Sequence, residues 1–236
     1  MSRKIYLFVP IFLIALILFS IMSPINTLSN DISQKVLRLH ILANSDSKAD
    51  QDLKIKVKDN ILNDTAYIFK NCNTLDESIE TANKNINIFQ KSAENTLKNC
   101  NSNYSVKVYV DKEFFDIREY KDFTLPSGYY NTIKVVIGEG KGHNWWCVMY
   151  PSVCISACTD DFDKVLTKEE KKMITSKKYI PKFKMLEIVN RLKNKIKSWH
   201  YIKNQLIYMC CAGVAKSADA RDLKSLGSNT VPVQVR

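Results

Sequence analysis

The most reactive side chains fall in one short segment, which contains His143, Cys147, Cys154 and Cys158. One histidine and three thiols can ligate zinc, but their spacing matches no standard zinc knuckle. Cys147 could instead act as a nucleophile with His143 as its base, if a third group oriented the histidine. The chain has no G-x-S-x-G, H-E-x-x-H or glycine-rich phosphate-binding motif. We therefore expect no catalytic residue, no metal ion and no cofactor.

A disulfide is the simplest use of two of these thiols. Cys147 and Cys154 enclose a short segment with Pro151, and a bridge between them would hold that segment in an exported protein. The chain has seven cysteines, so at least one thiol has no partner within the chain. A Cys147–Cys154 disulfide is thus predicted, and zinc or thiol chemistry at His143 and Cys147 is the alternative.

Two large aromatic residues stand beside these cysteines. Trp145 and Trp146 are adjacent in a predicted strand, so their side chains must point to opposite faces. One ring can fill the core, and the other would mark a contact surface if it is exposed. The alternative is that loops bury both rings.

A second group of polar residues occurs where another predicted strand ends. Asn44, Ser45 and Asp46 follow that strand, and ordinary turn and capping chemistry explains them. Arg38 and His40 share one face of the strand, because side chains alternate along it. Turn chemistry does not explain this arginine, whereas an acidic partner would.

The elements that must position these residues follow from the hydrophobic pattern. Strands are predicted at 36–43, 104–110, 129–137 and 144–150 from alternating or continuous apolar residues. Helices are predicted from Ser47 to about Phe69 and from Thr74 to Leu97, each with a capping box at its start. The sequence therefore predicts an α+β domain over residues 30–158, in which a helical hairpin covers one face of an antiparallel sheet.

Residues 1–23 have the pattern of an export segment. Arg3 and Lys4 precede an uncharged run, Ile5–Met22, which would span roughly 27 Å as a helix. A basic flank, an apolar run and a polar exit are typical of a signal peptide or a membrane anchor. No clear cleavage site follows, so both stay open, and a buried core helix is the alternative. We expect the rest of the chain to work outside the cytoplasm.

The net charge of +11 is concentrated near the C-terminal end of the chain. Residues 164–203 carry thirteen Lys or Arg against three acids, within a lysine-rich extension predicted over 159–209. Residues 179–207 are predicted to form a helix with an apolar stripe at Met185, Ile188, Leu192 and Ile196. Twelve of the thirteen cations are lysines, which favours an anionic membrane surface over nucleic acid. A solvated helix that binds nothing is the alternative.

Two motifs and a turn between them give the sequence a specific resemblance. They are Arg38–Ser47 with Asp50, Leu53 and Lys54; Pro126-x-Gly128-Tyr129; and Asn144–Val148 with Pro151 and Cys154. In this order they resemble the stage II sporulation protein R family of endospore-forming bacteria, over roughly residues 30–158.

The resemblance implies a secreted signalling protein that is made in the forespore. Such a protein acts in the space between forespore and mother cell, where it activates a membrane-embedded aspartic protease of the mother cell. The protease then processes the precursor of sigma factor E. We therefore expect a protein ligand without a catalytic role. Its expected partner-binding residues are Arg38, His40, Asn44, Ser45, Asp46, Asn144, Trp145 and Trp146.

Two other functions stay open at this point. One is an exported envelope-binding module that uses the lysine-rich helix. The other is a thiol or zinc enzyme that uses His143 and Cys147.

The last residues, 210–236, differ from the rest of the chain. From about Gly213 they show no periodic apolar face, so we expect a disordered tail. Arg221–Ser225 and Pro232–Arg236 can be encoded by codons that form two hairpins of a leucine tRNA gene. One hypothesis is that the reading frame runs into a neighbouring tRNA gene, and a polar tail of chance sequence is the alternative.

Overall fold

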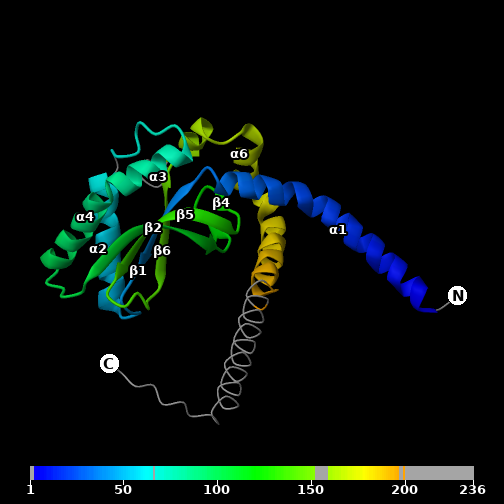
Figure 1. Cartoon of the computed structure of the whole chain (residues 1–236), viewed down its shortest axis with the longest axis horizontal. Helices are drawn as coiled ribbons and strands as arrows, with labels where there is room; N and C mark the ends of the chain where they lie inside the picture. The colour runs from blue at the N-terminus through cyan, green and yellow to red at the C-terminus, as the bar shows by residue number, and fades with distance from the viewer. Residues whose placement is uncertain (1–2, 66, 152–158, 197–198, 200–236) are drawn as a thin grey trace, which may run out of the picture. The chain divides into compact units, whose positions relative to one another are not determined.

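A computed structural model describes residues 3–65, 67–151, 159–196 and 199 (Figure 1). The chain divides into two units, Met1–Glu187 and Ile188–Arg236. The predicted tail over 210–236 lies outside the described residues, as do Cys154 and Cys158.

The first unit is built on a four-stranded sheet with the order β2-β5-β1-β6. Its strands are β1 (Leu37–Leu42), β2 (Val106–Phe115), β5 (Gly128–Ile137) and β6 (Asn144–Tyr150). Strand β1 pairs in parallel with β5 and antiparallel with β6, and β2 pairs antiparallel with β5. The α+β class is thus confirmed, but the sheet is mixed and not wholly antiparallel. Strand β1 is central, and five of its six residues are buried because both of its faces are covered. The long connection between β1 and β5 allows these two strands to run parallel.

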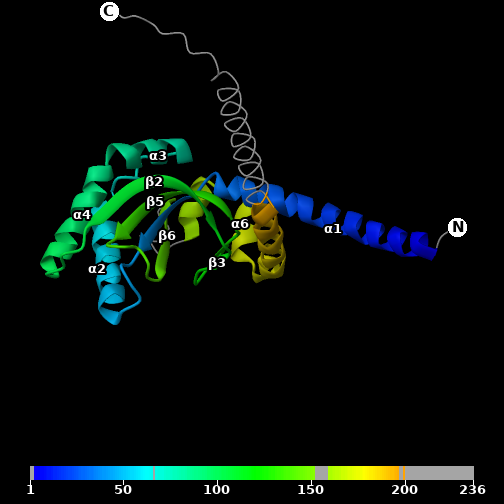
Figure 2. The same cartoon turned by 60° about the horizontal axis from the view of Figure 1, so that its bottom comes forward.

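Three helices cover one face of this sheet: α2 (Lys48–Thr65), α3 (Leu75–Lys84) and α4 (Ile86–Asn99). Figures 1 and 2 show α2 and α4 side by side against the strands. Both predicted helix starts are confirmed, since the Ser47 and Thr74 hydroxyls each accept from a backbone N–H three residues on, at 3.2 Å. The second predicted helix is in fact two, α3 and α4, which meet at Asn85.

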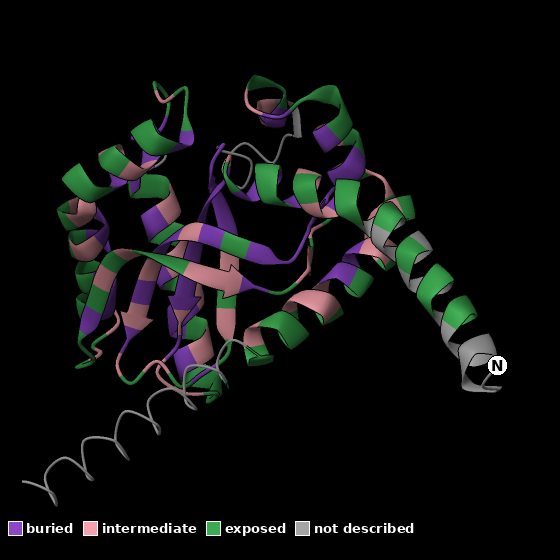
Figure 3. Cartoon of the chain, turned by 45° about the vertical axis from the view of Figure 1, so that its right-hand side comes forward, coloured by how far each residue is buried: buried purple, intermediate pink, exposed green. Residues whose placement is uncertain are grey.

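The main core lies between these helices and the sheet. The sheet contributes alternate apolar residues that are fully buried, such as Leu39, Ile41, Ile133 and Val135. Figure 3 shows buried residues gathered in the strands and on the inner sides of the helices, whereas the outer sides of the helices are exposed. Burial of this apolar surface is the main stabilising contribution to the fold.

A second core lies on the opposite face of the sheet. It gathers Ile32, Tyr130, Val148, Phe162 and Phe183. Tyr130 and Val148 come from β5 and β6, Ile32 from α1 (Arg3–Ser33), Phe162 from η1 (Thr159–Lys164) and Phe183 from the helical residues 180–196. Helix α6 (Lys168–Thr175) adds Met173 and Ile174 to this core. The core therefore draws on residues from both sides of the range 30–158. A small hairpin of β3 (Arg118–Glu119) and β4 (Thr124–Leu125) lies beside it, with Phe123 and Leu125 buried.

Helical structure occurs in both terminal regions where the sequence predicted it. The N-terminal helix α1 continues to Ser33, past the predicted apolar run, because Ile25 and Ile32 pack into the second core. Of the helices in the described part of the chain, none is long and apolar enough to cross a membrane. Residues 180–196 are helical, which accounts for the described part of the predicted basic helix.

One ion pair joins the segment before β1 to α6. The Lys35 ammonium lies 2.8 Å from both carboxylate oxygens of Glu170, whose side chain is almost completely buried. Glu170 also completes a capping box, since its carboxylate accepts from the Thr167 backbone N–H at 2.7 Å. Burial alone would raise the pKa of Glu170, but Lys35 and Thr167 outweigh it and hold this pKa below its usual range.

Replacing Glu170 by Gln isolates the charge of this pair. Glutamine keeps the shape and the helix cap but loses the charge-assisted bonds to Lys35. We expect Glu170→Gln to lower the free energy of unfolding by about 1–2 kcal/mol at neutral pH, measured by denaturant titration. Glu80→Gln, which breaks an exposed pair with Lys84, should cause no measurable change.

The same variant should reveal a pH dependence. Because the folded-state pKa of Glu170 is depressed, the carboxylate stabilises the fold above its unfolded-state pKa. This contribution disappears as the pH falls through the folded-state pKa. The difference between wild type and Glu170→Gln should therefore shrink between about pH 7 and about pH 3, and a constant difference would contradict the assignment.

Candidate partner-binding face

Strand alternation places Arg38 and His40 of β1 on the second face of the sheet, opposite α2–α4. The ladder sets Trp146 directly beside His40. We use the name polar face cluster for six residues of this face and the adjoining hairpin: Arg38, His40, Glu113, Arg118, Tyr120 and Trp146.

Arg38 is the most deeply buried member of the polar face cluster, with none of its surface exposed. Its guanidinium carbon lies 4.0 Å from the ring centre of Phe115 and 4.9 Å from that of Tyr130. Its Nη2 donates to the Tyr120 hydroxyl at 3.0 Å, whereas Nε and Nη1 have no partner among the described residues. The acidic partner expected for Arg38 is thus absent from this part of the chain, and aromatic rings surround the charge instead.

His40 is bound to the acid of the cluster. Its Nδ1 lies 2.7 Å from Oε2 of Glu113, and the other carboxylate oxygen of Glu113 accepts from Lys134. Burial alone would raise the pKa of Glu113, but these two partners outweigh it and lower the pKa. The imidazole stacks on Trp146 with ring centres 5.5 Å apart, and its Nε2 has no partner among the described residues.

Arg118 adds a second guanidinium to the cluster. It lies over the Trp146 ring, 3.7 Å from the ring centre, so one face of this indole contacts a cation. Partial burial lowers the pKa of Arg118 and the nearby charge of Arg38 acts in the same direction, whereas Tyr120 and Asp116 act in the opposite direction. The cluster is therefore a positively charged aromatic region of the sheet.

The two tryptophans point to opposite faces, as the strand pattern predicts. Trp145 lies on the α2 side, where the Lys58 ammonium is 4.8 Å from its ring centre, and 36% of its surface is exposed. Trp146 is half-buried in the polar face cluster. Asn144 shares the Trp146 face and is half-buried, and its Oδ1 has no partner among the described residues.

The turn after β1 has a structural role that its hydrogen bonds make clear. The Asp50 carboxylate accepts from Asn44 at 3.0 Å and from Ser45 at 2.6 Å, and these bonds lower its pKa. Asn44 Oδ1 accepts from the Glu139 backbone, and Asp46 accepts from the His143 backbone at 2.6 Å. Asn44 and Asp46 thus hold the turn to the loop between β5 and β6, and Ser45 holds it to α2.

His143 and Cys147 do not come together. His143 is exposed and its Nδ1 lies 2.5 Å from Asp46, whereas Cys147 is buried in the main core. Four residues of extended chain separate them by roughly 13 Å. This geometry contradicts the alternative of a thiol enzyme that pairs them. Among the described residues, no group of three or more His, Cys, Asp or Glu side chains could hold a metal ion.

The predicted disulfide stays a prediction. Cys154 lies outside the described residues, as does Cys158 of the proposed zinc set.

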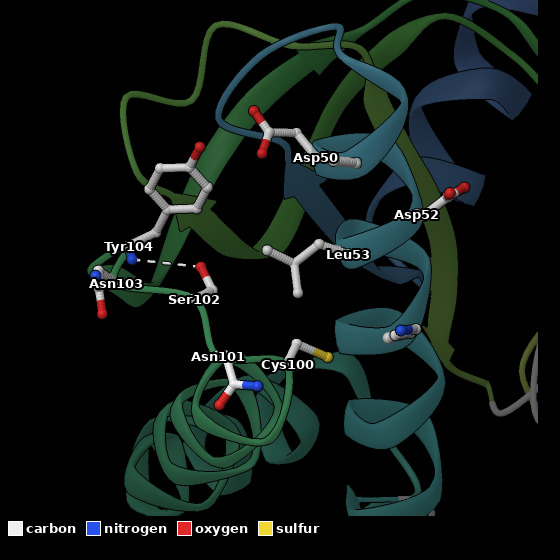
Figure 4. A pocket seen from close by; sticks show the side chains of 10 residues that line it. Asp50, Asp52, Leu53, Cys100, Asn101, Ser102, Asn103 and Tyr104 are labelled. Carbon is white, nitrogen blue, oxygen red and sulfur yellow. Dashed lines mark hydrogen bonds between the residues drawn. The ribbon is translucent and has the colours of Figure 1, made fainter.

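A hollow of about 590 Å³ lies on the other side of the turn after β1. Figure 4 shows it between α2, which carries Asp50 and Leu53, and the segment from Cys100 to Tyr104. The Tyr104 hydroxyl interacts with the Asp50 carboxylate, which raises the pKa of Tyr104. Asp50 is the main polar group of this hollow, and its carboxylate already accepts hydrogen bonds from Asn44 and Ser45. These bonds hold the protein together and compete with any ligand for the carboxylate.

Several members of the face had no signal in the sequence. Glu113 and Tyr120 lie 73 and 82 residues from their partners in β1, and Arg118 reaches Trp146 of β6 from the β3–β4 hairpin. Tyr109, 41% exposed, and Lys134 extend the face toward β2 and β5. Only a known strand register could have identified them.

A substitution of Gly142 tests whether contacts with the β5–β6 loop hold the turn after β1 in place. A Cβ at this position would overlap the carbonyl oxygen of Ser45, so the loop or the turn must shift. We expect Gly142→Ala to lower the free energy of unfolding by about 1–3 kcal/mol and to speed hydrogen exchange at the His143 amide. Gly128→Ala is the matched control, because the nearest atoms to its Cβ lie at an ordinary 3.7 Å. Equal effects of the two substitutions would contradict this role.

The fold and the site define an α+β protein with a positively charged, aromatic sheet face that its helices cover only in part. The chain belongs to the stage II sporulation protein R family, whose model matches residues 33–160. It is also similar to the stage II sporulation protein R of Bacillus subtilis strain 168, with 31% identity over 166 residues. That match covers 70% of this chain and 72% of the relative. No solved structure matches the chain.

The family resemblance predicted from the two motifs is therefore confirmed, and with it a role in sporulation. The matched range contains the whole sheet, α2–α4 and the polar face cluster.

Proposed function

We propose that the protein is a secreted sporulation signal. It is exported from the forespore, acts between the two membranes and activates a membrane-embedded aspartic protease of the mother cell. The protease then processes the precursor of sigma factor E. The protein acts as a ligand and has no catalytic role itself. Family membership over residues 33–160 is the observation that carries this proposal.

Export is supported by the N-terminal sequence. The uncharged run Ile5–Met22 follows two basic residues, which is the pattern of a signal peptide or an anchor. A retained anchor would tether the folded unit to the membrane that it crossed, and the receptor would then have to come within reach.

The uncovered half of the second sheet face is the surface that we assign to the protease. Val106, Val108 and Val110 of β2 face the main core and are buried or half-buried, whereas Lys107, Tyr109 and Asp111 on the other face are exposed. Lys134 and Trp146 continue this surface and are half-buried. An aromatic surface with charged neighbours is typical of protein-binding sites.

Activation in a reconstituted system tests this function. Purified full-length protein is added to membranes that contain the protease and the sigma-factor precursor, and cleavage of the precursor is measured. We expect cleavage only with the protein present, and a reduction of roughly tenfold with Tyr109→Ala because an exposed aromatic contact is lost. Tyr67→Ala is the matched control, since Tyr67 is exposed but lies after α2.

The outcomes separate the function from the surface. No cleavage with the wild-type protein would contradict the signalling function. Cleavage that Trp145→Ala abolishes and Tyr109→Ala leaves intact would keep the function but move the contact to the α2 side of the sheet.

A contact with an anionic membrane is a second candidate function, favoured by the exposed lysine-rich helix. Its predicted apolar stripe is uncovered, with Ile188, Leu192 and Ile196 each more than half exposed. Lys193 and Lys195 lie on the same helical segment and are exposed. An apolar stripe with flanking lysines is typical of helices that lie in the headgroup region of anionic membranes.

Binding to lipid vesicles tests this contact. Lys193→Gln with Lys195→Gln should weaken binding of the full-length protein to anionic vesicles by roughly tenfold or more, since each lysine near such a surface contributes about 1 kcal/mol. Binding to neutral vesicles should not change. Lys91→Gln with Lys98→Gln on α4 removes the same charge elsewhere and should leave both unchanged. Equal losses for the two pairs would contradict the assignment.

A further inference from the structure

The charge of Arg38 is the unexplained feature of the sheet. It is fully buried, and its nearest polar partner is the neutral hydroxyl of Tyr120. Two of its three nitrogens have no hydrogen-bond partner among the described residues. A buried charge without a counter-ion carries a large desolvation penalty, and contacts with aromatic rings offset only part of it. Packing alone would be served as well by an apolar side chain of similar size.

The neighbours of Arg38 do not neutralise it. Glu113, the acid of the polar face cluster, is shared between His40 and Lys134. Arg118 adds a further positive charge close enough to Arg38 for each to disfavour the other. His40 is buried to more than nine-tenths, and its Nε2 is a second buried polar atom without a partner among the described residues. Asp116 is an acidic neighbour of Arg118. Arg38 has no acidic partner among the described residues, so the cluster lacks one negative charge at Arg38.

The β3–β4 hairpin lies over this position. It supplies Arg118, and its connecting residues supply Tyr120, which stacks on Phe123 at 4.5 Å. Each strand of the hairpin has two residues, and the Tyr120 N–H donates to the Phe123 carbonyl at 2.8 Å. Figure 2 shows β3 on the side of the sheet nearer to α6. A shift of the Arg118–Tyr120 side of this small element breaks few backbone hydrogen bonds, so it exposes Arg38 more readily than a change in the main sheet or in the buried Phe123 and Leu125.

We propose that Arg38 is the anchor of a carboxylate-binding site that a glutamate or aspartate side chain of the protein partner completes. The acidic side chain enters beneath the β3–β4 hairpin and displaces the Tyr120 hydroxyl from Arg38. Arg118 forms the second cationic contact, and the rings of Phe115 and Trp146 form the walls. The identity of the partner rests on the proposed function, whereas the carboxylate chemistry rests on the cluster itself.

Two physical arguments favour a carboxylate. A hydrogen bond from a guanidinium to a carboxylate is about twice as strong as one to a neutral hydroxyl, so the exchange at Arg38 is favourable. A single negative charge matches the one that the cluster lacks. A phosphate dianion would bring a second charge and a larger hydration shell into an aromatic environment.

The experiment follows the Arg38 Nε–H signal by NMR in ¹⁵N-labelled full-length protein in detergent micelles. N-acetylglutamate amide is the probe, N-acetylglutamine amide is its neutral isostere, and inorganic phosphate is the other anion. We expect a saturable shift of the Arg38 signal with the glutamate derivative and none with the glutamine derivative. No saturable shift, an equal response to glutamine, or tighter binding of phosphate would overturn the proposal.

Variants separate ligand binding from a structural role. Tyr120→Phe removes the competing hydroxyl and should tighten binding of the glutamate derivative about fivefold, while Arg118→Gln should weaken it about fivefold. Arg38→Met should abolish binding and leave stability unchanged or higher, which a structural arginine would not. If Arg38→Met does not fold, the Tyr120 and Arg118 variants decide the question, and unchanged binding in both would contradict the site.

The outcomes for the carboxylate-binding site and for the proposed function can be told apart. A protein that activates the protease but does not bind the glutamate derivative would overturn this inference alone. A protein that binds the derivative but activates no protease would overturn the proposed function alone.

Discussion

The alternation of side chains along β1 is the constraint on which the rest of the first unit depends. Leu37, Leu39 and Ile41 are fully buried against the helices, so the residues between them must face the other way. Arg38 and His40 therefore enter the second face in the middle of the sheet, with β5 on one side and β6 on the other. A slip of one residue would exchange the two sets, which couples the cluster to the stability of the main core.

The second core connects both ends of the first unit to the sheet face on which Arg38 and His40 lie. The end of α1, the aromatic residues of β5 and the segment around α6 share one apolar cluster. The Lys35–Glu170 pair fastens the chain just before β1 to the start of α6. The lysine-rich extension thus begins as part of the folded unit, and its exposed apolar stripe lies farther along the chain.

The sequence predicted what local patterns control. The strand periods, the caps at Ser47 and Thr74 and the two faces of Trp145 and Trp146 all depend on nearby residues. The central position of β1 and the break at Asn85 were not predicted, because they depend on long-range pairing and packing. For the same reason the partners Glu113 and Tyr120 came only from the structure, since they lie 73 and 82 residues from His40 and Arg38.

The motif that begins at Arg38 divides into two physically different halves. Asn44 and Ser45 donate to Asp50, and Asn44 and Asp46 accept from the β5–β6 loop, so their hydrogen bonds stabilise the fold. Arg38 and His40 have buried polar atoms that find no partner in the described part of the chain, which weakens the fold that holds them. From the sequence, both halves were expected to bind the protein partner. The satisfied half explains how the chain holds its shape, and the unsatisfied half is where a partner has binding free energy to gain.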